Sequence, residues 1–482
     1  MATTPILAGF YPDPSICRVE NKFFLLNSSF EYVPGLPIHC SEDLINWKLV
    51  GHAAPEASTV ASPVGFAGAS TGLYGPSLRH HEGLFWATTT SLGNFLDGPL
   101  ITHSKRPEGR WSRPVHVNGV VGIDPDLAWD DEGVCLLTWR SIDPSGISQV
   151  DIDPYTGSTL SPARLLWSDE VLGETEGPHL IRRGPWWYLF TAQGGTHTGH
   201  GVSVARSRDP RGPFEPCPAN PIFSHRSTNH PVQATGHGDV VEMPDGSWAM
   251  VYLGIRQHGS FPRYHVLGRE TFLAALNWRN DWPVIDEGHF TEPPPPSSFD
   301  DDFADLDPRW VSPSVTPTEF ATTEVGLTLI QGRFADDSEQ TRVLCTRIQH
   351  HEWDARVLPA SGDLAMSLRI DARHWYGIEL IGQRIRTRAV SDPFDRVFTE
   401  HNLPAGAYLA IRARKIAQTE RGTRGPDRIS LGFEINGEFN SLTELDGRHL
   451  STEVAGGFTG RMLGLESLSS QACITSASIV PR

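Results

Sequence analysis

The sequence predicts an all-β protein, a five-bladed β-propeller followed by a C-terminal β-sandwich. Three observations support this prediction. One sequence pattern occurs five times before residue 291, a run of prolines follows at 293–296, and polar and apolar residues alternate after it. The 46 glycines and 38 prolines favour many tight turns. Neither half of the chain contains a pattern typical of a long helix.

The five repeated segments begin at Asp13, Gly75, Asp124, Gly177 and Gly238. Each opens on Gly or Asp, with Pro next in four of them, and continues as a short apolar strand, a polar turn and a strongly apolar strand. Their starts are roughly 50–60 residues apart, about the length of a four-stranded propeller blade with its loops. A generic β-sandwich has no reason to repeat one opening five times, so the repeat predicts five blades.

The prolines predict a domain boundary. Consecutive prolines cannot continue a strand or a helix, and they form a stiff, extended connector. We therefore expect a catalytic propeller at 1–292, a linker at 293–298 and an accessory β-sandwich at 299–482. Period-two alternation and hairpin turns such as Ile435-Asn436-Gly437 indicate antiparallel strands in the second domain.

Charge and composition exclude several classes of partner. The formal net charge of −17 disfavours nucleic acid and anionic membranes, and no apolar stretch approaches the roughly 18 residues of a membrane helix. The N-terminus has neither a basic nor an apolar leader region, so we expect a cytoplasmic protein, or a secreted one if a signal has been removed. Six scattered cysteines without metal-site spacing predict reduced, mostly buried thiols: Cys17, Cys40, Cys135, Cys217, Cys345 and Cys473.

The repeat places particular side chains around one axis. Equivalent positions in successive blades surround the central channel, so the five openings bring together Asp13, Tyr74, Asp124, Glu176 and His237 at one end of it. An isolated Asp-Pro pair is usually a turn. The shared register is what makes these three carboxylates candidates for a site.

Three carboxylates suit the hydrolysis of a glycosidic bond. The reaction needs an acid for the leaving oxygen and a carboxylate that activates water or attacks carbon. The acid must stay protonated near neutral pH, which burial or a neighbouring negative charge can ensure. In inverting enzymes the two working carboxyls stand roughly 6.5–9.5 Å apart.

A calcium site is the competing use of these acids. Calcium prefers six to eight oxygens, often at short spacing within one loop, whereas these three acids lie far apart in the sequence. Asp130, Asp131 and Glu132 fall in a predicted hairpin turn and indicate a solvated loop. Whether Asp126 points at the site is left open.

Several strings resemble glycoside hydrolase family 43, in the order found in that family and over the whole chain, which includes the C-terminal sandwich. They are GFYPDPSI (9–16), GLPIHCSEDLINWKLVGHA (35–53), GIDPDL (122–127), TEGPHL (175–180), FTAQGGT (190–196), GHGDVVE (236–242), LGRET (267–271) and STEVAGGFTG (451–460). The resemblance implies that Asp13 is the general base, Asp124 orients the acid and tunes its pKa, and Glu176 is the general acid. It also implies inversion and exo action.

The same resemblance suggests substrate contacts. Arg269 would bind sugar hydroxyls as a fork of donors, Phe30 would line the pocket, and Thr196 would offer a hydroxyl near the acid. His237 would bind the sugar or hold a hydrated calcium ion. Tyr74 stands where β-xylosidases of this family have the Trp of a Trp-Ala-Pro string, which changes the pocket wall.

The first hypothesis is an α-L-arabinofuranosidase that releases terminal residues from hemicellulose-derived saccharides, with β-D-xylosidase activity as well. Its partners would be arabinose- or xylose-containing oligosaccharides, and it would require no cofactor, with calcium at the propeller axis left open. The alternatives are a strict β-D-xylosidase, an endo-arabinanase and a non-catalytic carbohydrate-binding propeller. The sequence leaves the oligomeric state open.

Overall fold

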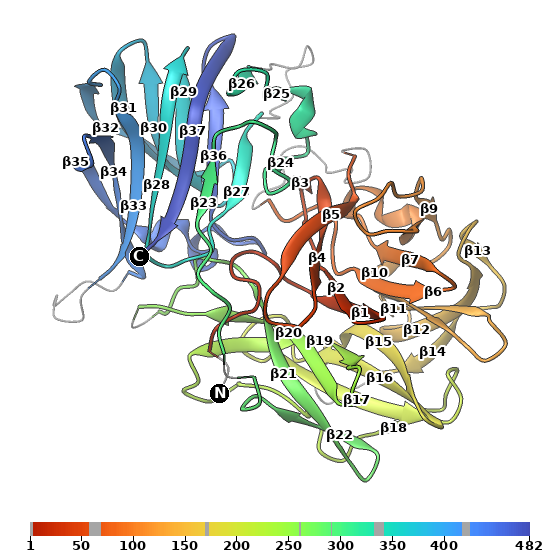
Figure 1. Cartoon of the computed structure of the whole chain (residues 1–482). Coiled ribbons are helices and arrows are strands. Elements are labelled where there is room, and N and C mark those ends of the chain that lie inside the picture. The colour runs from red at the N-terminus through yellow and green to blue at the C-terminus, as the bar shows by residue number, and fades with distance from the viewer. Residues whose placement is uncertain are drawn as a thin grey trace.

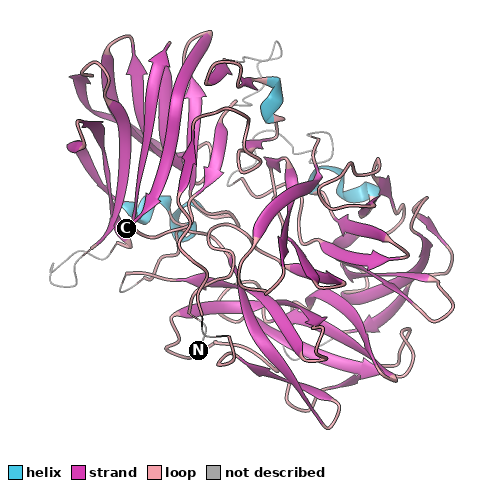
Figure 2. Ribbon diagram, viewed as in Figure 1, coloured by secondary structure: helices cyan, strands magenta, loops and turns pink. Residues whose placement is uncertain are grey.

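The computed structural model describes residues 3–56, 69–168, 173–259, 262–290, 292–331, 342–416 and 425–482. Figures 1 and 2 show two bodies built almost wholly of strands, so the predicted all-β class with a propeller and a sandwich is confirmed. Helical segments in this part of the chain are short: η1 (Leu92–Asp97), η2 (Pro317–Glu319), η3 (Gly447–Leu450) and α2 (Thr452–Ala455). None of its helices is long and apolar enough to cross a membrane.

The first body consists of five consecutive antiparallel sheets. The first is β1 (Ser15–Val19), β2 (Lys22–Leu26), β4 (Gly35–Ser41) and β5 (Lys48–Ala54). The second is β6 (Ser77–His81), β7 (Leu84–Thr89), β8 (Leu100–Ser104) and β9 (Val115–His116). The third is β10 (Gly122–Trp129), β11 (Cys135–Ser141), β12 (Gly146–Asp153), β13 (Ser158–Thr159) and β14 (Arg164–Trp167). The fourth is β15 (Glu176–Arg183), β16 (Trp186–Gln193), β17 (Gly201–Ser207) and β18 (Glu215–Pro216). The fifth is β19 (Val232–Glu242), β20 (Trp248–Arg256), β21 (Glu270–Arg279) and β22 (Trp282–Asp286).

Each repeated segment forms the first hairpin of one sheet, as predicted. The first strands pack on one another in the order β1, β6, β10, β15 and β19, and β19 packs back on β1, so the ring is closed. The N-terminal segment supports the closure, because Leu7 forms an antiparallel bridge with Thr271 of the last sheet. The ring is a β-propeller, and its first strands line the axis.

The blade openings depart from regular strand geometry. The register shifts between Ile123 and Asp126, between Glu176 and His179, and between Gly236 and Asp239. Proline lacks a backbone N–H, so it is found in sheets mainly at bulges and edges, as Pro125 and Pro178 are here. The backbone has positive φ at Asp13 (51°), Asp124 (53°), Gly177 (56°) and His237 (47°). For residues other than glycine this conformation is strained, and such strain is concentrated at functional sites.

The second body is a sandwich of two antiparallel sheets that enclose one large apolar core. One sheet comprises β23 (Phe299–Asp301), β25 (Ala321–Thr322), β26 (Leu327–Ile330), β28 (Trp353–Ser361), β33 (Tyr408–Lys415), β34 (Asp427–Ile435), β35 (Glu438–Asp446) and β37 (Gln471–Pro481). The other comprises β27 (Leu344–Arg347), β29 (Leu364–Arg369), β30 (His374–Ile381), β31 (Arg384–Ser391), β32 (Phe394–Asn402) and β36 (Met462–Ser467). The predicted hairpin joins β34 to β35, with φ of 53° at Asn436 and 80° at Gly437.

The two bodies make direct contacts. Strand β24 (Ser312–Pro313) pairs with β3 (Tyr32–Val33) of the propeller chain, and Arg347 Nε donates to the Phe10 carbonyl at 2.8 Å. The Phe458 backbone N–H donates to Ser70 Oγ at 2.7 Å. The loop that carries Phe458 therefore lies against the propeller beside the blade openings.

The six cysteines are all free thiols, as predicted, and four of them are buried: Cys17, Cys135, Cys217 and Cys345.

Candidate active site

Asp13 lies at the axis, held by its neighbours. Its Oδ2 accepts a hydrogen bond from Ser28 Oγ at 2.5 Å, and its Oδ1 lies 3.4 Å from His237 Nδ1. Burial lowers the pKa of His237 to about 4, although Asp13 opposes this effect. His237 is therefore neutral at neutral pH and faces Asp13 as an uncharged ring.

Asp124 interacts electrostatically with both other acids, Asp13 and Glu176. Its Oδ2 accepts a hydrogen bond from the Gly177 backbone N–H at 3.0 Å. Burial, then Glu176, then Asp13 raise the pKa of Asp124 well above its ordinary value. The carboxyl thus contacts the residue that follows Glu176 and interacts with both other acids.

Glu176 has the properties that a general acid needs. Burial first and the Asp13 carboxylate second raise the pKa of Glu176 to about 7, while Arg269 and Arg140 oppose the rise. At neutral pH a substantial fraction of the side chain is therefore protonated. The predicted carboxylates Asp13, Asp124 and Glu176 come together at one end of the axis, as the repeat predicted.

Two glycines, Gly75 and Gly177, leave room for the Asp124 carboxyl and the His237 ring to lie close to the neighbouring backbone. A Cβ at Gly75 would lie 2.4 Å from Asp124 Oδ1, and a Cβ at Gly177 would lie 3.0 Å from the His237 ring. Gly177 also has a φ that residues with side chains rarely adopt. The Gly-Pro openings of the second and fourth repeats are thus explained by crowding at the axis.

Arg269 precedes β21 and interacts electrostatically with two of the acids, Asp13 and Glu176. Its Nη2 donates to the Thr196 carbonyl at 3.4 Å, and its guanidinium lies 4.7 Å from the centre of the Phe458 ring. Burial lowers the pKa of Arg269, and Asp13 and Glu176 oppose this. Arg269 and Thr196, which were predicted separately as substrate contacts, therefore lie together, through the Thr196 backbone carbonyl.

An aromatic wall borders the acids. Phe30 is stacked with Phe10 at 5.8 Å and with Phe458 at 5.7 Å between ring centres, and Tyr74 meets Phe30 edge-on at 5.2 Å. Burial, then Asp13 and Asp124, raise the pKa of Tyr74 to about 12, and its hydroxyl donates to the Ser70 carbonyl at 2.8 Å. Phe30 is only 2% exposed, so Tyr74 and Phe458 offer more surface than Phe30 does.

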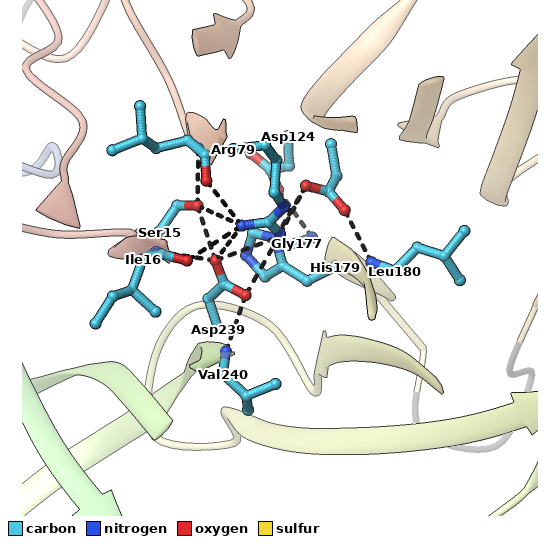
Figure 3. Close-up of polar contacts among 11 residues, drawn as sticks. Ser15, Ile16, Arg79, Asp124, Gly177, His179, Leu180, Asp239 and Val240 are labelled. Carbon is cyan, nitrogen blue, oxygen red and sulfur yellow. Dashed lines mark hydrogen bonds and ion pairs between the residues drawn. The ribbon is translucent and has the colours of Figure 1, made fainter. Parts of the chain in front are cut away.

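A buried polar cluster lies among the first strands of the propeller sheets (Figure 3). Arg79 of β6 lies at its centre, with Nη1 2.7 Å from Asp239 Oδ2 and Nη2 2.7 Å from Asp126 Oδ1. Its Nη2 also lies 3.0 Å from His179 Nδ1, and Ser15 Oγ donates to Asp239 Oδ2 at 2.8 Å. The five side chains come from the first strands of all five sheets, so the cluster joins the whole ring.

This cluster contains three titratable residues that the sequence did not identify: Arg79, His179 and Asp239. Asp126, whose direction the sequence left open, pairs with Arg79 in the cluster and accepts from the Leu180 N–H at 2.8 Å. Burial would raise the pKa of Asp239, but Arg79 and His179 outweigh it, so that the pKa is lowered. Asp126 and Asp239 are each the first paired residue after the register shift in β10 and β19. A buried arginine between two carboxylates needs all its partners.

The role of Phe458 was not predicted either, although its string was noted in the resemblance. It lies in the sandwich, and nothing in its local sequence indicates contact with Phe30 and Arg269. Arg140 of β11 was also missed, and it lowers the pKa of both Asp124 and Glu176.

The surroundings of His237 fit a calcium ion poorly. Calcium prefers six to eight oxygen ligands, whereas the His237 ring lies against Asp13 on one side, against the backbones of Gly75 and Gly177, and 5.9 Å from the His179 ring. Among the described residues, the group of metal-binding side chains with suitable geometry lies elsewhere and does not include His237.

The arrangement has what acid–base hydrolysis requires. The Glu176 carboxyl has a pKa near neutrality, and the Asp13 carboxylate is held by Ser28. The Asp124 carboxyl interacts with both of them, and the buried Arg269 guanidinium lies close by. An acid of this kind can protonate a leaving oxygen while a carboxylate activates water.

Comparisons with known proteins agree with this chemistry. The family model described as "Glycosyl hydrolases family 43" matches residues 2–283, and that described as "Beta xylosidase C-terminal Concanavalin A-like domain" matches residues 299–479. A non-reducing end α-L-arabinofuranosidase of Bacteroides ovatus is 42% identical over 58% of this chain and 53% of the relative. A xylosidase/arabinosidase of Butyrivibrio fibrisolvens is 37% identical over 60% of this chain and 57% of the relative.

Among solved structures, the Bacteroides ovatus xyloglucan PUL GH43B matches with a TM-score of 0.84 and 31% identity, over 99% of both chains. The sequence matches to the two curated relatives are shorter: they cover 53% and 57% of the length of those relatives.

Proposed function

Because this chain belongs to glycosyl hydrolase family 43, as its motifs predict, we propose that it is an exo-acting, inverting glycosidase. Its main substrates are terminal α-L-arabinofuranosyl residues of hemicellulose-derived oligosaccharides, and terminal β-D-xylosyl residues are cleaved as well. The observation that carries the proposal is the acid pair at the axis, in which burial and Asp13 raise the pKa of Glu176 to about 7.

In the proposed reaction, Glu176 protonates the glycosidic oxygen and Asp13 takes a proton from the attacking water. Ser28 and His237 orient the Asp13 carboxylate through contacts of 2.5 Å and 3.4 Å. Asp124 keeps Glu176 in place by accepting a hydrogen bond from the Gly177 N–H. A single displacement by water gives a product of inverted configuration.

The substrate contacts follow from the groups around the acids. Arg269 offers a planar fork of donors to sugar hydroxyls, and its tie to Thr196 keeps that fork in place. Tyr74 and Phe458 form an apolar wall against one face of the sugar. A wall that includes a side chain from the sandwich limits the site on one side, which favours a terminal sugar over the middle of a polymer.

The choice of sugar has support from the relatives. The Bacteroides ovatus relative is named a non-reducing end α-L-arabinofuranosidase, and the Butyrivibrio fibrisolvens relative a xylosidase/arabinosidase. The smaller Tyr74 ring in place of tryptophan is consistent with a preference for arabinofuranosides. A strict β-D-xylosidase is the second candidate, since a relative from Vibrio is named a xylan 1,3-beta-xylosidase and one from Bacillus subtilis a beta-xylosidase.

Family 43 enzymes are generally cofactor-independent, and we propose the same for catalysis here. Every proton transfer in the scheme is assigned to Asp13, Glu176 and water. Dialysis against a chelator should leave the initial rate at 25 °C unchanged, whereas a loss that calcium alone restores would assign the ion an essential place at the axis.

The proposal is tested by initial rates on aryl α-L-arabinofuranoside and aryl β-D-xylopyranoside, with proton NMR of the first product to assign its anomeric configuration. We expect the arabinofuranoside to be cleaved faster, with inversion. Asp13→Asn should lower the rate roughly 10²–10⁴-fold, and Glu132→Gln, in an exposed turn, should not. A folded protein that cleaves neither substrate, or one that retains configuration, would refute the proposal.

A further inference from the structure

A second group of chemically active side chains lies outside the candidate active site, in the segments that flank the fifth sheet. It consists of His225 and His230, between β18 and β19, and Glu287, directly after β22. One ligand atom of each lies within 4.8 Å of the other two, and no other such group of three occurs among the residues that the structure describes. This group is independent of the proposed function, because it contains none of the active-site residues.

The His225 ring is oriented for metal binding. Its Nδ1 lies 2.9 Å from the Val232 carbonyl oxygen, so Nδ1 carries the hydrogen and donates it. Its Nε2 lies 2.9 Å from Glu287 Oε2. A histidine that binds a metal typically donates its other ring N–H to a carbonyl or carboxylate, which fixes the tautomer and the ring orientation.

The His230 ring faces the same carbonyl. Its Nδ1 lies 3.1 Å from the Val232 oxygen and also 3.1 Å from the Val232 nitrogen, so the ring can take either tautomer. Its Nε2 is buried and has no hydrogen-bond partner among the described residues. The two ring centres are 3.9 Å apart. A hydrogen bond or ion pair between His225 and Glu287 accounts for two members of the group but leaves this buried nitrogen unexplained.

Glu287 is also held in place, because its Oε1 accepts a hydrogen bond from Tyr252 at 3.1 Å. We propose that His225, His230 and Glu287 bind one zinc ion through two imidazole nitrogens and a carboxylate oxygen. Zinc accepts this ligand set with a fourth position for water, at bonds of about 2.0–2.2 Å. Tetrahedral ligand atoms are then about 3.3 Å apart, so a small inward movement of the side chains completes the site.

The position of the site indicates a structural role. The His225 backbone N–H donates to Thr235 Oγ1 at 3.2 Å, two residues before His237, and Glu287 precedes the proline linker. An ion here would tie the start of β19, which carries His237, to the end of the last blade. We therefore expect zinc to raise the thermal stability of the propeller without taking part in the reaction.

The test uses the full chain, dialysed against a chelator and titrated with Zn²⁺ alone. We expect one equivalent to bind and the melting temperature to rise by at least about 3 °C at a hundredfold excess over Kd. Co²⁺ in its place should give visible absorption bands of a four-coordinate nitrogen–oxygen site. His230→Gln, checked for folding by circular dichroism and unchanged hydrolysis, should lose both effects.

Two controls separate this site from others. His449→Gln removes an exposed histidine of the sandwich and should keep the full response. Glu176→Gln should also keep it, because the catalytic acids are not its ligands, so the result does not depend on the proposed reaction. The absence of a response in the wild type, or an equal response in His230→Gln and the wild type, would overturn the zinc site.

Discussion

The Asp13 carboxylate, second only to burial, raises the pKa of Glu176 to about 7, although the two residues belong to the first and fourth sheets of the propeller. The ring closure that brings their blades to one axis thus sets the protonation of the proposed acid. The pH dependence of the enzyme should follow from this relationship.

The first prediction concerns the alkaline limb of the pH–rate profile. Since Glu176 must be protonated, kcat/KM should fall as pH rises through about 7. Arg140 lowers the pKa of Glu176, so Arg140→Met should move this limb to higher pH. Arg106→Met, which removes an exposed arginine that is not among the groups shifting the pKa of Glu176, serves as the control. A limb that stays in place in Arg140→Met would contradict the assignment.

The second prediction concerns stability. A carboxyl whose pKa is raised on folding contributes stability that is full below its unfolded pKa, near 4.3, and is lost as pH rises through the folded pKa, about 7. Gln mimics the protonated acid at every pH. Glu176→Gln should therefore melt a few degrees above the wild type at pH 8, with the difference shrinking by pH 5. Equal melting temperatures at pH 8 would show that the ionised acid is not destabilised in the fold.

How much the sequence could predict depended on whether a residue belonged to the repeat. Asp13, Asp124, Glu176 and His237 were found because five similar openings around one axis must bring equivalent positions together. The register shifts at the openings of β10, β15 and β19 then change the direction of the side chains, so that a neighbouring position, as in Asp239, points to the buried cluster around Arg79. No periodic pattern predicts that change.

Phe458 could not be predicted for a different reason. It lies far along the chain from Phe30, and their contact depends on how the sandwich docks, which local sequence patterns do not specify. Arg79 was missed because a single arginine in a short strand usually points to solvent. Its burial becomes understandable only when Asp126, His179 and Asp239 from three other blades surround it.

The third prediction tests the contribution of the sandwich to the site. Phe458→Ala removes the ring that stacks on Phe30 and lies beneath the Arg269 guanidinium. We expect kcat/KM to fall roughly 10- to 100-fold with the fold retained. Phe394→Ala, which truncates a 76% exposed ring elsewhere in the sandwich, should leave the rate unchanged. Equal rates for the two variants would exclude a role for Phe458 at the site.

The fourth prediction concerns the buried cluster. Asp239→Asn leaves Arg79 with one of its two carboxylate partners, which should cost about 3–5 kcal/mol of stability, as loss of a buried partner typically does. Because the pKa of Asp239 is lowered in the fold, its stabilisation is present above the unfolded pKa and lost as pH falls through the folded one. Denaturant unfolding of the wild type, Asp239→Asn and the exposed-turn variant Asp245→Asn measures this. A cost no larger than that of Asp245→Asn would contradict the role of the cluster.

The most direct test of the central claim, that Glu176 protonates the leaving oxygen, compares two leaving groups in Glu176→Gln. A nitrophenolate departs with little help from an acid, whereas a sugar alcohol needs its proton from the enzyme. We predict that Glu176→Gln loses kcat/KM on an arabinofuranosyl oligosaccharide at least roughly 10²-fold more than on the matching nitrophenyl arabinofuranoside. The same factor of loss on both substrates would contradict the assignment of Glu176 as the general acid.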